Sequence, residues 1–391
     1  MQVPTCTKRK VGLRFGRLWL REEPGRDGPV TSTKTPPTKL VRAVERVRHH
    51  LSRINQRAVP PAAAMMELIM GAWIAQLISA AAELGIADEL AGGPATGEEL
   101  SRRLNVDQDA LRRMLRALIG IGVFRHRSDG RYELTALAET LRTDSPVSMA
   151  GMARWVGSAQ HREHWSHVAD AIRTGSAVVP ALRGKPIFDY LADEPALAGL
   201  FNQAMTGLSE SSVSAVVAAY DFSRFATIAD VGGGHGRLLA AILESAPQAR
   251  GVLFDLPEVV AGAPVLLRRH GVEHRIRIDP GSFFESVPEG ADAYVLKHII
   301  HDWPDDDAVR ILQNVRSAAR RDARVLLIEF VIPDHDRNFH GKWVDIEMLV
   351  VANARERTAA EYGQLLDKAG FRLTRVVDTV GPISILEAVA V

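Results

Sequence analysis

The chain has 391 residues, of which 46% are hydrophobic and 24% charged, and its formal net charge is +1. These values are typical of a globular protein of two or three domains and exclude a disordered or fibrous chain. The single cysteine, Cys6, excludes an internal disulfide framework and a cysteine-based metal site, which fits a reducing cytosol.

The N-terminal segment carries most of the imbalance in charge. The first 57 residues hold 14 Lys and Arg against 4 Asp and Glu, which leaves 34 basic and 43 acidic residues in the remainder. Residues 1–38 have no sustained periodicity, so we expect a basic, disordered tail, with contact to nucleic acid or a membrane as the alternative. No apolar core follows the basic residues, so we expect no secretory signal and a cytoplasmic protein.

Residues 39–208 have a helical pattern and form the first predicted domain. Residues 65–90 are hydrophobic nearly all round, which predicts a long helix covered by other protein. The most apolar run, Leu68 to Ala82, is interrupted by Gln76 and is shorter than the ~20 residues that span a bilayer. We therefore expect a buried helix and no membrane partner.

Two short helices and a hairpin follow, in the order of a winged-helix module. The stretch Thr96-Gly-Glu-Glu99 is a capping box that predicts a helix start. A second helix is predicted at 110–121 from apolar residues at helical spacing. Ser-Asp-Gly at 128–130, between apolar segments, predicts a small hairpin or wing.

DNA binding is the alternative function of such a module. A recognition helix offers Arg, Lys, Asn or Gln side chains to a groove, and Arg112, Arg113 and Arg116 lie on the second predicted helix. Arginines also form the ordinary solvated face of an amphipathic helix, and the body of the chain is acidic. We therefore favour assembly over transcriptional regulation and expect no nucleic-acid partner.

Residues 209–391 form the second predicted domain, where short apolar strands alternate with helices from about residue 226. Strands separated by helices predict an α/β fold with a Rossmann-like parallel sheet, whose ligands bind at the carboxyl ends of the strands. The expected strands are 227–231, 251–255, 275–278, 291–297 and 323–330, and the expected helices are 237–244, 259–269 and 305–319.

The sharpest motif is the glycine-rich turn that begins at Asp230. Gly232, Gly234 and Gly236 fit G-x-G-x-G, whereas dinucleotide-binding folds have G-x-G-x-x-G, which speaks against a nicotinamide oxidoreductase. Glycines let the backbone pass close to a ligand. Asp255 ends the next strand, 19 residues after Gly236, where a carboxylate accepts hydrogen bonds from ribose hydroxyls. The pattern predicts a nucleoside-containing cofactor.

A second motif, at 296–303, ends the fourth predicted strand and contains His301. A histidine there faces the ligand crevice, and its near-neutral pKa suits it to accept a proton from a hydroxyl. A carboxylate partner would fix its tautomer, and Asp302, Glu329 and Glu356 are all candidates. We expect the remaining histidines of this region to be structural and no metal to be bound; these histidines are His298, His335 and His340.

Four ordered motifs together resemble the caffeic-acid type O-methyltransferases of plants and bacteria, over roughly residues 60–391. They are Asp230–Gly236, Phe254–Pro257, Leu296–Pro304 and Arg355–Thr358. The resemblance implies a homodimer held by N-terminal winged-helix domains. It also implies methyl transfer from S-adenosylmethionine to a hydroxyl of a small aromatic or polyketide-like molecule, with His301 as the base flanked by Glu329 and Glu356.

The same resemblance implies roles for further residues. Lys297 would help Asp255 to hold the cofactor, with Asp230, the motif glycines and Leu256 beside them. Ser282-Phe283 stands where many relatives have Asp before an apolar residue that packs on adenine, so here the adenine amine would meet an uncharged hydroxyl. The implied acceptor-lining residues are Met205, Trp155, Met348 and Asn353, with Trp165 as a further apolar candidate.

Some bacterial relatives have lost the base histidine and catalyse decarboxylation or hydroxylation. This chain keeps His301, which favours methyl transfer over such a repurposed reaction. A metabolite-binding winged-helix regulator remains the other alternative.

Overall fold

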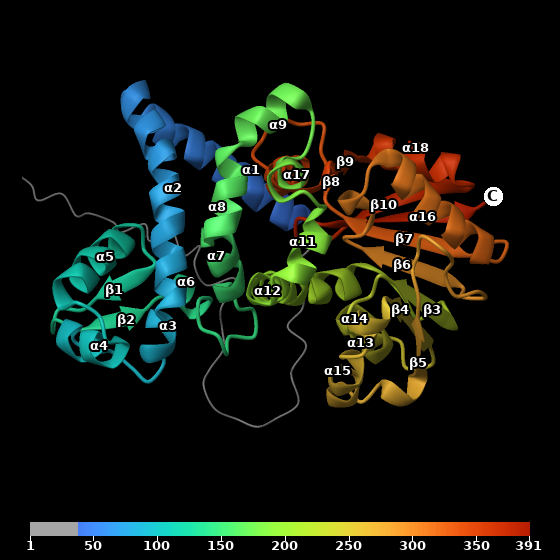
Figure 1. Ribbon diagram of the computed structural model, residues 1–391, viewed down its shortest axis with the longest axis horizontal. Helices are drawn as coiled ribbons and strands as arrows, with labels where there is room; N and C mark the ends of the chain where they lie inside the picture. Colours follow the sequence, from blue (N-terminus) through green and yellow to red (C-terminus); the bar gives the residue numbers. More distant parts are fainter. Residues whose placement is uncertain (1–37) are drawn as a thin grey trace, which may run out of the picture. The chain divides into compact units, whose positions relative to one another are not determined.

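The computed structural model describes residues 38–391, which form a helical N-terminal part and an α/β C-terminal part (Figure 1). The predicted tail at 1–38 lies, apart from Thr38, outside the described residues. The helical part begins with α1 (Thr38–Arg57), α2 (Pro61–Glu83), α3 (Ile86–Glu89), α4 (Gly97–Leu104) and α5 (Gln108–Gly120). It continues with β1 (Phe124–His126), β2 (Tyr132–Leu134) and α6 (Ala136–Glu139).

The predicted pair of helices and hairpin are present as α4, α5 and the antiparallel pair β1–β2. The capping box forms as expected: the Thr96 hydroxyl accepts the Glu99 N–H at 3.2 Å, and the Glu99 carboxylate accepts the Thr96 N–H at 2.8 Å. Leu100, Leu115 and Leu118 pack inside this module. On α5, Arg112 pairs with Asp109 at 2.5 Å on the exposed side.

Helix α2 differs from its prediction as a buried helix. Only Ser79, Ala81 and Ala82 are buried along it, whereas Trp73 is 65% exposed in the described chain. By length and composition alone it is the one helix among the described residues that could cross a membrane. Core helices of soluble proteins meet the same criterion. The sequence pattern identified an apolar helix correctly but could not show that this chain leaves most of it uncovered. Its other exposed apolar residues are Met65, Met66, Leu68, Ile69 and Met70.

A run of helices connects the two parts. They are α7 (Ala150–Gly157), α8 (Ala159–Ser166), α9 (Val168–Thr174), α10 (Val178–Arg183), α11 (Ile187–Asp193) and α12 (Pro195–Ala219). The expected domain boundary at 208/209 falls inside α12, which is continuous over 25 residues. Together with α17 (His340–Ala352) these helices enclose an apolar cluster that includes Trp155 and Met348.

The C-terminal part is built on a seven-stranded sheet in the order β10-β11-β7-β6-β3-β4-β5. Five adjacent strands, from β7 to β5, are parallel, as predicted, and β10 and β11 form an antiparallel pair at the other edge that the sequence did not predict. The strands are β3 (Thr227–Val231), β4 (Arg250–Asp255), β5 (Ile276–Pro280), β6 (Ala293–Lys297), β7 (Arg324–Glu329), β10 (Phe371–Asp378) and β11 (Ser384–Ala390). A two-stranded parallel pair is formed by β8 (Val331–Ile332) and β9 (Arg357–Thr358).

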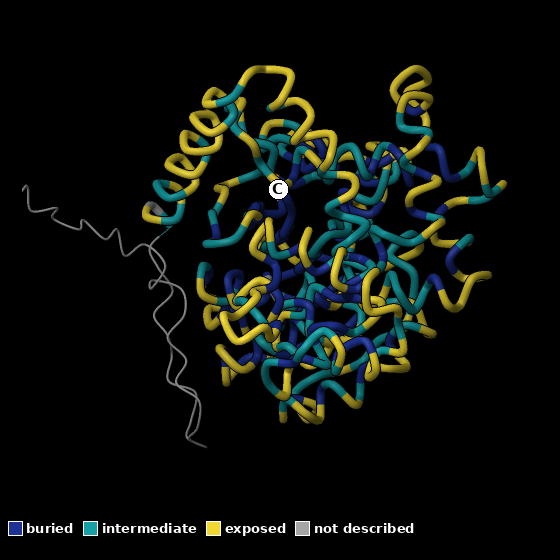
Figure 2. The backbone as a smooth tube through the Cα atoms, turned by 90° about the vertical axis from the view of Figure 1, so that its left-hand side faces the viewer, coloured by how far each residue is buried: buried dark blue, intermediate teal, exposed yellow. Residues whose placement is uncertain are grey.

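Helices cover both faces of this sheet, because successive side chains along each strand point to opposite faces. Ile228 and Leu253 contribute to one buried cluster, and Ala229 and Val252 to the other. Buried residues accordingly fill the interior, and exposed residues follow the outer helices (Figure 2). The helical elements are α13 (Arg237–Ser245), α14 (Pro257–Val260), α15 (Ala263–Arg269), η1 (Glu273–Arg275), η2 (Ile300–Asp302), α16 (Asp305–Ala318) and α18 (Ala359–Lys368).

The sheet order changes direction at β3, which lies between β4 and β6. In parallel sheets with such a reversal the connections on the two sides diverge, and ligands bind outside the carboxyl ends of the strands at this point. The glycine-rich turn follows β3, Asp255 ends β4, and the turn that carries His301 follows β6. The fold therefore brings the two predicted motifs to the same edge of the sheet.

Candidate active site

The glycine-rich turn between β3 and α13 has a backbone that side chains would disturb. Gly232, Gly234 and Gly236 have φ angles of +70°, +60° and +83°, in the left-handed region that glycine tolerates best. A Cβ atom at Gly232 would overlap the side chain of Ile299, whereas nothing in the described chain lies within 4 Å of one at Gly234. The turn is thus packed on one side and open in front of Gly234.

Asp255, at the end of β4, is joined to this turn by a hydrogen bond. Its Oδ2 accepts the Gly234 N–H at 2.8 Å and its Oδ1 accepts the N–H of the exposed Leu256 at 2.7 Å. Burial raises the pKa of Asp255, and the two backbone donors oppose that rise. Each carboxylate oxygen has a second lone pair, so two further hydrogen bonds can be accepted beside the turn.

The buried carboxyl of Asp230, at the start of the turn, lies within electrostatic reach of the half-buried Lys297. Asp230 is 2% exposed, and burial raises its pKa to about 7 although Lys297 attracts it. Its Oδ2 has no hydrogen-bond partner in the described chain. Burial lowers the pKa of Lys297 to about 8, and its Nζ donates to the Ser209 hydroxyl at 3.2 Å. Asp230 therefore has acceptor capacity that the described residues leave unused.

Ser282 and Phe283 lie on the same side of the crevice. The ring of Phe283 lies 3.6 Å from the position a Cβ would take at Gly232. It also contacts Trp303 edge to face at a centroid distance of 6.0 Å. The Ser282 hydroxyl accepts the Phe284 N–H at 3.3 Å. An aromatic face and a hydroxyl thus stand beside the glycine turn.

His301 is held mainly by Glu356. Its Nδ1 lies 2.6 Å from Glu356 Oε1, and its Nε2 lies 3.3 Å from Asp302 Oδ1. Glu329 Oε1 instead accepts the N–H groups of Ile299 and Ile300, at 3.2 and 2.9 Å. Of the three candidate carboxylates, Glu356 therefore orients the ring, and Glu329 fixes the backbone that carries it.

The electrostatics of this cluster favour a retained proton. Burial lowers the pKa of His301, but Asp302, Glu329 and Glu356 more than offset this and raise it to about 10. Burial in turn raises the pKa of Asp302 to about 6, and raises those of Glu329 and Glu356. An imidazole next to two buried carboxylates and the partly exposed one of Asp302 is a strong proton acceptor.

Arg357, which the sequence analysis passed over, holds the His301 turn in shape. Its guanidinium is 1% exposed and donates to the carbonyl oxygens of Ile300 and Trp303, at 3.1 and 3.0 Å, and to Asp305 at 2.6 Å. Only arginine offers five donors in one rigid fork. The sequence marks Arg357 only by its position within the Arg355–Thr358 motif. The groups to which its guanidinium donates are apparent only in the folded structure.

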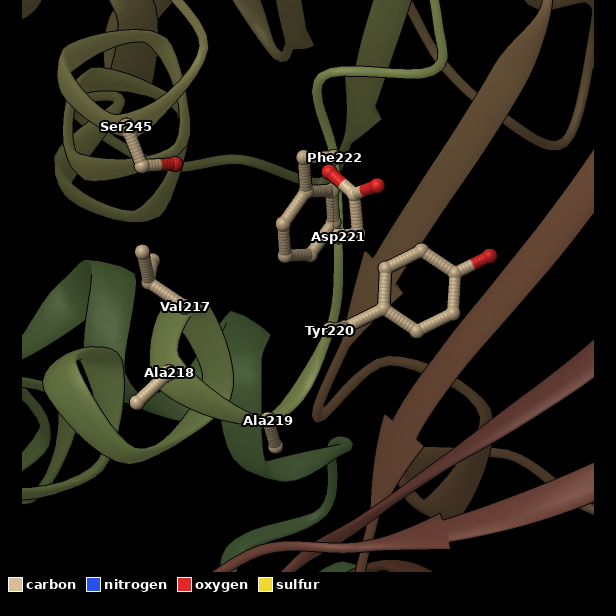
Figure 3. Close-up of a pocket in the computed structure, with 7 residues that line it drawn as sticks. All are labelled: Val217, Ala218, Ala219, Tyr220, Asp221, Phe222 and Ser245. Atoms are coloured by element: carbon tan, nitrogen blue, oxygen red, sulfur yellow. The ribbon is translucent and has the colours of Figure 1, made fainter. Parts of the chain in front are cut away.

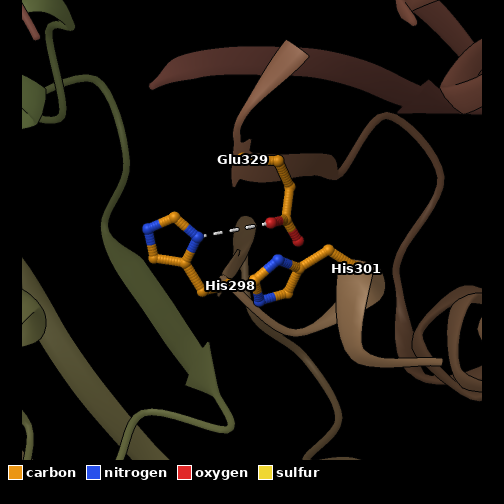
Figure 4. Close-up of side chains that lie close together, drawn as sticks. All are labelled: His298, His301 and Glu329. Carbon is orange, nitrogen blue, oxygen red and sulfur yellow. Dashed lines mark ion pairs between the residues drawn. The ribbon is translucent and has the colours of Figure 1, made fainter. Parts of the chain in front are cut away.

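His298 and Glu329 face each other next to His301 (Figure 4). His298 Nδ1 lies 3.6 Å from Glu329 Oε2, and neither atom has a hydrogen-bond partner in the described chain. The ligand atoms of the three residues lie within 4.8 Å of one another. Two imidazoles and a carboxylate can hold a metal, although His301 Nδ1 is already engaged by Glu356; that no metal binds stays a prediction.

Most of the predicted acceptor residues lie together among the helices. Trp155 is 5% exposed and packs edge to face against Phe201, at a centroid distance of 5.2 Å. Phe188 lies 6.4 Å from Phe201 and 6.3 Å from Trp303, two residues after His301. Aromatic rings thus extend from the helical cluster to the histidine turn; Met205 and Met348 belong to the same cluster.

Asn353 is the exception among these residues. It ends α17 with a φ of +53°, and its amide oxygen accepts the N–H of Ala177. This contact ties the segment before α10 to α17, so the amide oxygen already serves a structural purpose.

A separate surface pocket of about 310 Å³ lies away from these residues (Figure 3). Its walls come from the end of α12, the loop before β3 and Ser245 at the end of α13. These segments precede strands, so the pocket lies at the amino-terminal edge of the sheet. Ligands of such sheets bind at the opposite edge, and we assign this pocket no part in the site.

Comparison with known proteins gives two family matches. Residues 165–372 match the model of an O-methyltransferase domain, and residues 66–144 match that of an O-methyltransferase dimerisation domain. Phenazine O-methyltransferase PhzM of Lysobacter antibioticus is 40% identical over 331 residues, which cover 85% of this chain and 97% of the relative.

Solved structures agree with these matches. The crystal structure of LaPhzM has a TM-score of 0.80 and 40% identity, over 85% of this chain and all of that one. The methyltransferase CalO1 of calicheamicin biosynthesis, in its SAH-bound form, has a TM-score of 0.76 and 37% identity, over 85% of this chain and 98% of that one.

Proposed function

The chain belongs to the O-methyltransferase family and is an S-adenosylmethionine-dependent enzyme that methylates oxygen; from this premise we propose that His301 is its general base and that its acceptor is a phenol. The observation that carries the proposal is the 2.6 Å contact between His301 Nδ1 and Glu356 Oε1. It lies beside the glycine turn at the carboxyl edge of the sheet, where both substrates of a methyl transfer would meet.

The residues of the crevice fit S-adenosylmethionine. The open space in front of Gly234 admits a ligand close to the backbone, and Asp255 would accept the ribose hydroxyls. The unused Asp230 oxygen suits the ligand's amino group. Beside the turn, Leu256 and Phe283 would pack on adenine, and Ser282 would bond its amine. When bound, the cofactor supplies an electrophilic methyl group on a cationic sulfonium, whose charge also lowers the pKa of a nearby imidazole.

The chain's own contribution is to position a hydroxyl and remove its proton. With Nδ1–H donated to Glu356, His301 presents Nε2 as the acceptor, and the imidazolium that forms is stabilised by Asp302, Glu329 and Glu356. The raised His301 pKa of about 10 lies near the pKa of ~10 typical of a phenol. The cofactor's charge lowers the His301 pKa from this value, which shifts the balance of proton transfer toward a neutral imidazole; an aliphatic alcohol is a far weaker acid than a phenol and would yield its proton less readily still.

The acceptor class follows from this balance and from the lining of the helical cluster. Trp155, Phe201 and Met348 offer aromatic and thioether surface, which packs well against flat aromatic rings. The name of one relative, phenazine O-methyltransferase PhzM, supports the same choice, because a phenazine is an aromatic ring system. We infer an aromatic or polyketide-like phenol as the acceptor, which the enzyme meets in the cytoplasm.

The exposed face of α2 fits a homodimer. The dimerisation match begins at residue 66 and includes most of α2, and an exposed apolar face of this extent marks an interaction site. A second copy of the chain would cover Met66, Ile69 and Trp73. In this proposal the small α4–α5 module serves assembly as a winged-helix domain and binds no DNA, and α2 meets a second chain in place of a membrane.

The base assignment is tested by His301→Ala, with a matched His298→Asn control that suits the φ of +53° at position 298. Turnover of labelled cofactor with a panel of phenols and polyketides should fall by ~10² to 10⁴-fold in His301→Ala. The Kd for S-adenosylmethionine should stay unchanged, and the control should retain turnover within a few-fold. Unchanged methyl transfer by His301→Ala would overturn the assignment.

A further inference from the structure

A partly exposed acidic side chain borders the apolar helical cluster. Glu347, on α17, has one carboxylate oxygen 3.1 Å from His161 Nε2, and the other accepts the Trp165 Nε1–H at 2.5 Å. Both donors come from α8, more than 180 residues earlier in the chain. Neither Glu347 nor His161 belongs to any motif that the sequence analysis identified.

The carboxylate of Glu347 has unused capacity for hydrogen bonds. Within residues 38–391 no Lys or Arg forms an ion pair with it; His161 is its one ion-pair partner. A carboxylate has about four acceptor positions, and the described side chains use two of them. Its side chain is still 21% exposed although that of His161 is only 7% exposed, so space remains next to the carboxylate.

This group is adjacent to the proposed acceptor site. Glu347 directly precedes Met348, and the His161 ring packs edge to face against Trp155 at a centroid distance of 5.3 Å. Helix α17 contacts both α8 and the η2 turn that carries His301. The same aromatic rings that lead to the histidine turn therefore end at the Glu347 carboxylate.

We infer that Glu347, held by His161 and Trp165, determines acceptor specificity by recognising a hydrogen-bond donor on the acceptor. That donor is an amine or a second hydroxyl, distant from the hydroxyl that is methylated. The inference rests on the proposed function, because it places the acceptor in the helical cluster. A carboxylate on the acceptor at this point would meet Glu347 with like charge and be rejected.

The chemistry predicts a selective effect on acceptor binding. A site that bonds a donor discriminates against an analogue that lacks it, because an acceptor position of the carboxylate then loses its partner. Glu347 touches neither the reacting hydroxyl nor His301, so its replacement should change KM for donor-bearing acceptors and leave kcat nearly unaltered.

The test uses three matched acceptors, 2-naphthol, 6-amino-2-naphthol and 6-hydroxy-2-naphthoate, within a wider phenol panel. The wild-type enzyme should prefer the amino compound and discriminate against the carboxylate. In Glu347→Gln the preference for the amino compound over 2-naphthol should fall by about tenfold, through KM. The kcat/KM for 6-hydroxy-2-naphthoate relative to 2-naphthol should rise by a similar factor. Glu163→Gln, an exposed acid on the same helix as His161, is the matched control.

Two outcomes separate this inference from its premise. If Glu347→Gln lowers kcat/KM equally for all three naphthols and lowers Tm, the residue only ties α8 to α17 and the inference is wrong. If the wild-type enzyme binds S-adenosylmethionine but methylates no phenol in the panel, the proposed function itself fails.

Discussion

The sheet edge and the helical cluster build the two halves of the site in different ways. At the sheet edge, the residues that meet lie in short stretches at the ends of neighbouring strands, such as Gly234 with Asp255. In the helical cluster, partners such as His161 and Glu347 are 186 residues apart. From this difference we expect the reaction type to depend on local motifs and the choice of acceptor to depend on contacts between distant helices.

The helical region should also be the half that depends on a second chain. Trp73 is 65% exposed, so Trp73→Glu removes little within one chain but places a charge in the proposed interface. The dissociation constant of the dimer should rise by at least ~30-fold, because a central interface residue contributes about 2 kcal/mol or more. Sedimentation velocity measures the shift to monomer.

Glu83→Gln, at the exposed end of α2, is the control for that experiment. A monomeric wild-type chain that partitions into lipid vesicles would contradict the homodimer and favour a membrane partner for α2.

Asp255→Asn tests whether residues at the sheet edge alone determine the affinity for the cofactor. The amide would present a donor to backbone N–H groups that now donate to the carboxylate. Losing a hydrogen bond to a charged group costs about 1.5–3 kcal/mol, so the Kd for S-adenosylmethionine should rise by roughly 10- to 100-fold. Titration calorimetry measures it, with the exposed Glu258→Gln as control. The KM for the acceptor should hardly change; a parallel rise would break the separation between the two halves.

Glu356→Gln tests the role of the carboxylates through the pH dependence of kcat/KM. Burial lowers the pKa of His301 while three carboxylates raise it, to about 10. The free base that accepts a proton therefore accumulates as pH rises, and kcat/KM should increase above neutral pH. Removing the Glu356 charge lowers that pKa, so the rising limb should move to lower pH while the maximum falls about tenfold. A limb that stays in place would mean that His301 is not the titrating base.

Phe201→Leu is the mildest change and concerns the acceptor alone. It removes the edge-to-face contact with Trp155, an interaction worth about 0.5–1.5 kcal/mol. The KM for aromatic acceptors should rise ~2- to 10-fold at unchanged Kd for S-adenosylmethionine, in initial-rate assays. A loss of cofactor affinity instead would show that the two halves are coupled.

The sequence predicted the sheet edge well because each strand and each motif there is continuous in the chain. The strand at 227–231 and the helix that begins at Asp305 are confirmed at their predicted positions. From the sequence alone Glu356 could not be preferred to Glu329 as the partner of His301. Glu329 ends β7 and Glu356 directly precedes β9, and only the folded turn decides which oxygen faces Nδ1. Arg357 and Glu347 escaped notice because their partners are remote in sequence.

The antiparallel pair β10–β11 was missed for a different reason. Its first strand carries alternating basic and apolar residues, a weak signal beside the buried parallel strands, and the exposed face of α2 was misjudged because an apolar pattern does not reveal which chain covers it.

The hydrogen bond from the Gly234 N–H to Asp255 has a thermodynamic consequence. It restrains the glycine turn at three left-handed positions that its glycines adopt without strain. Association then loses little conformational entropy at this loop. Binding of the cofactor should accordingly proceed as a rigid-body encounter, with an association rate governed by access to the crevice and no slow ordering phase.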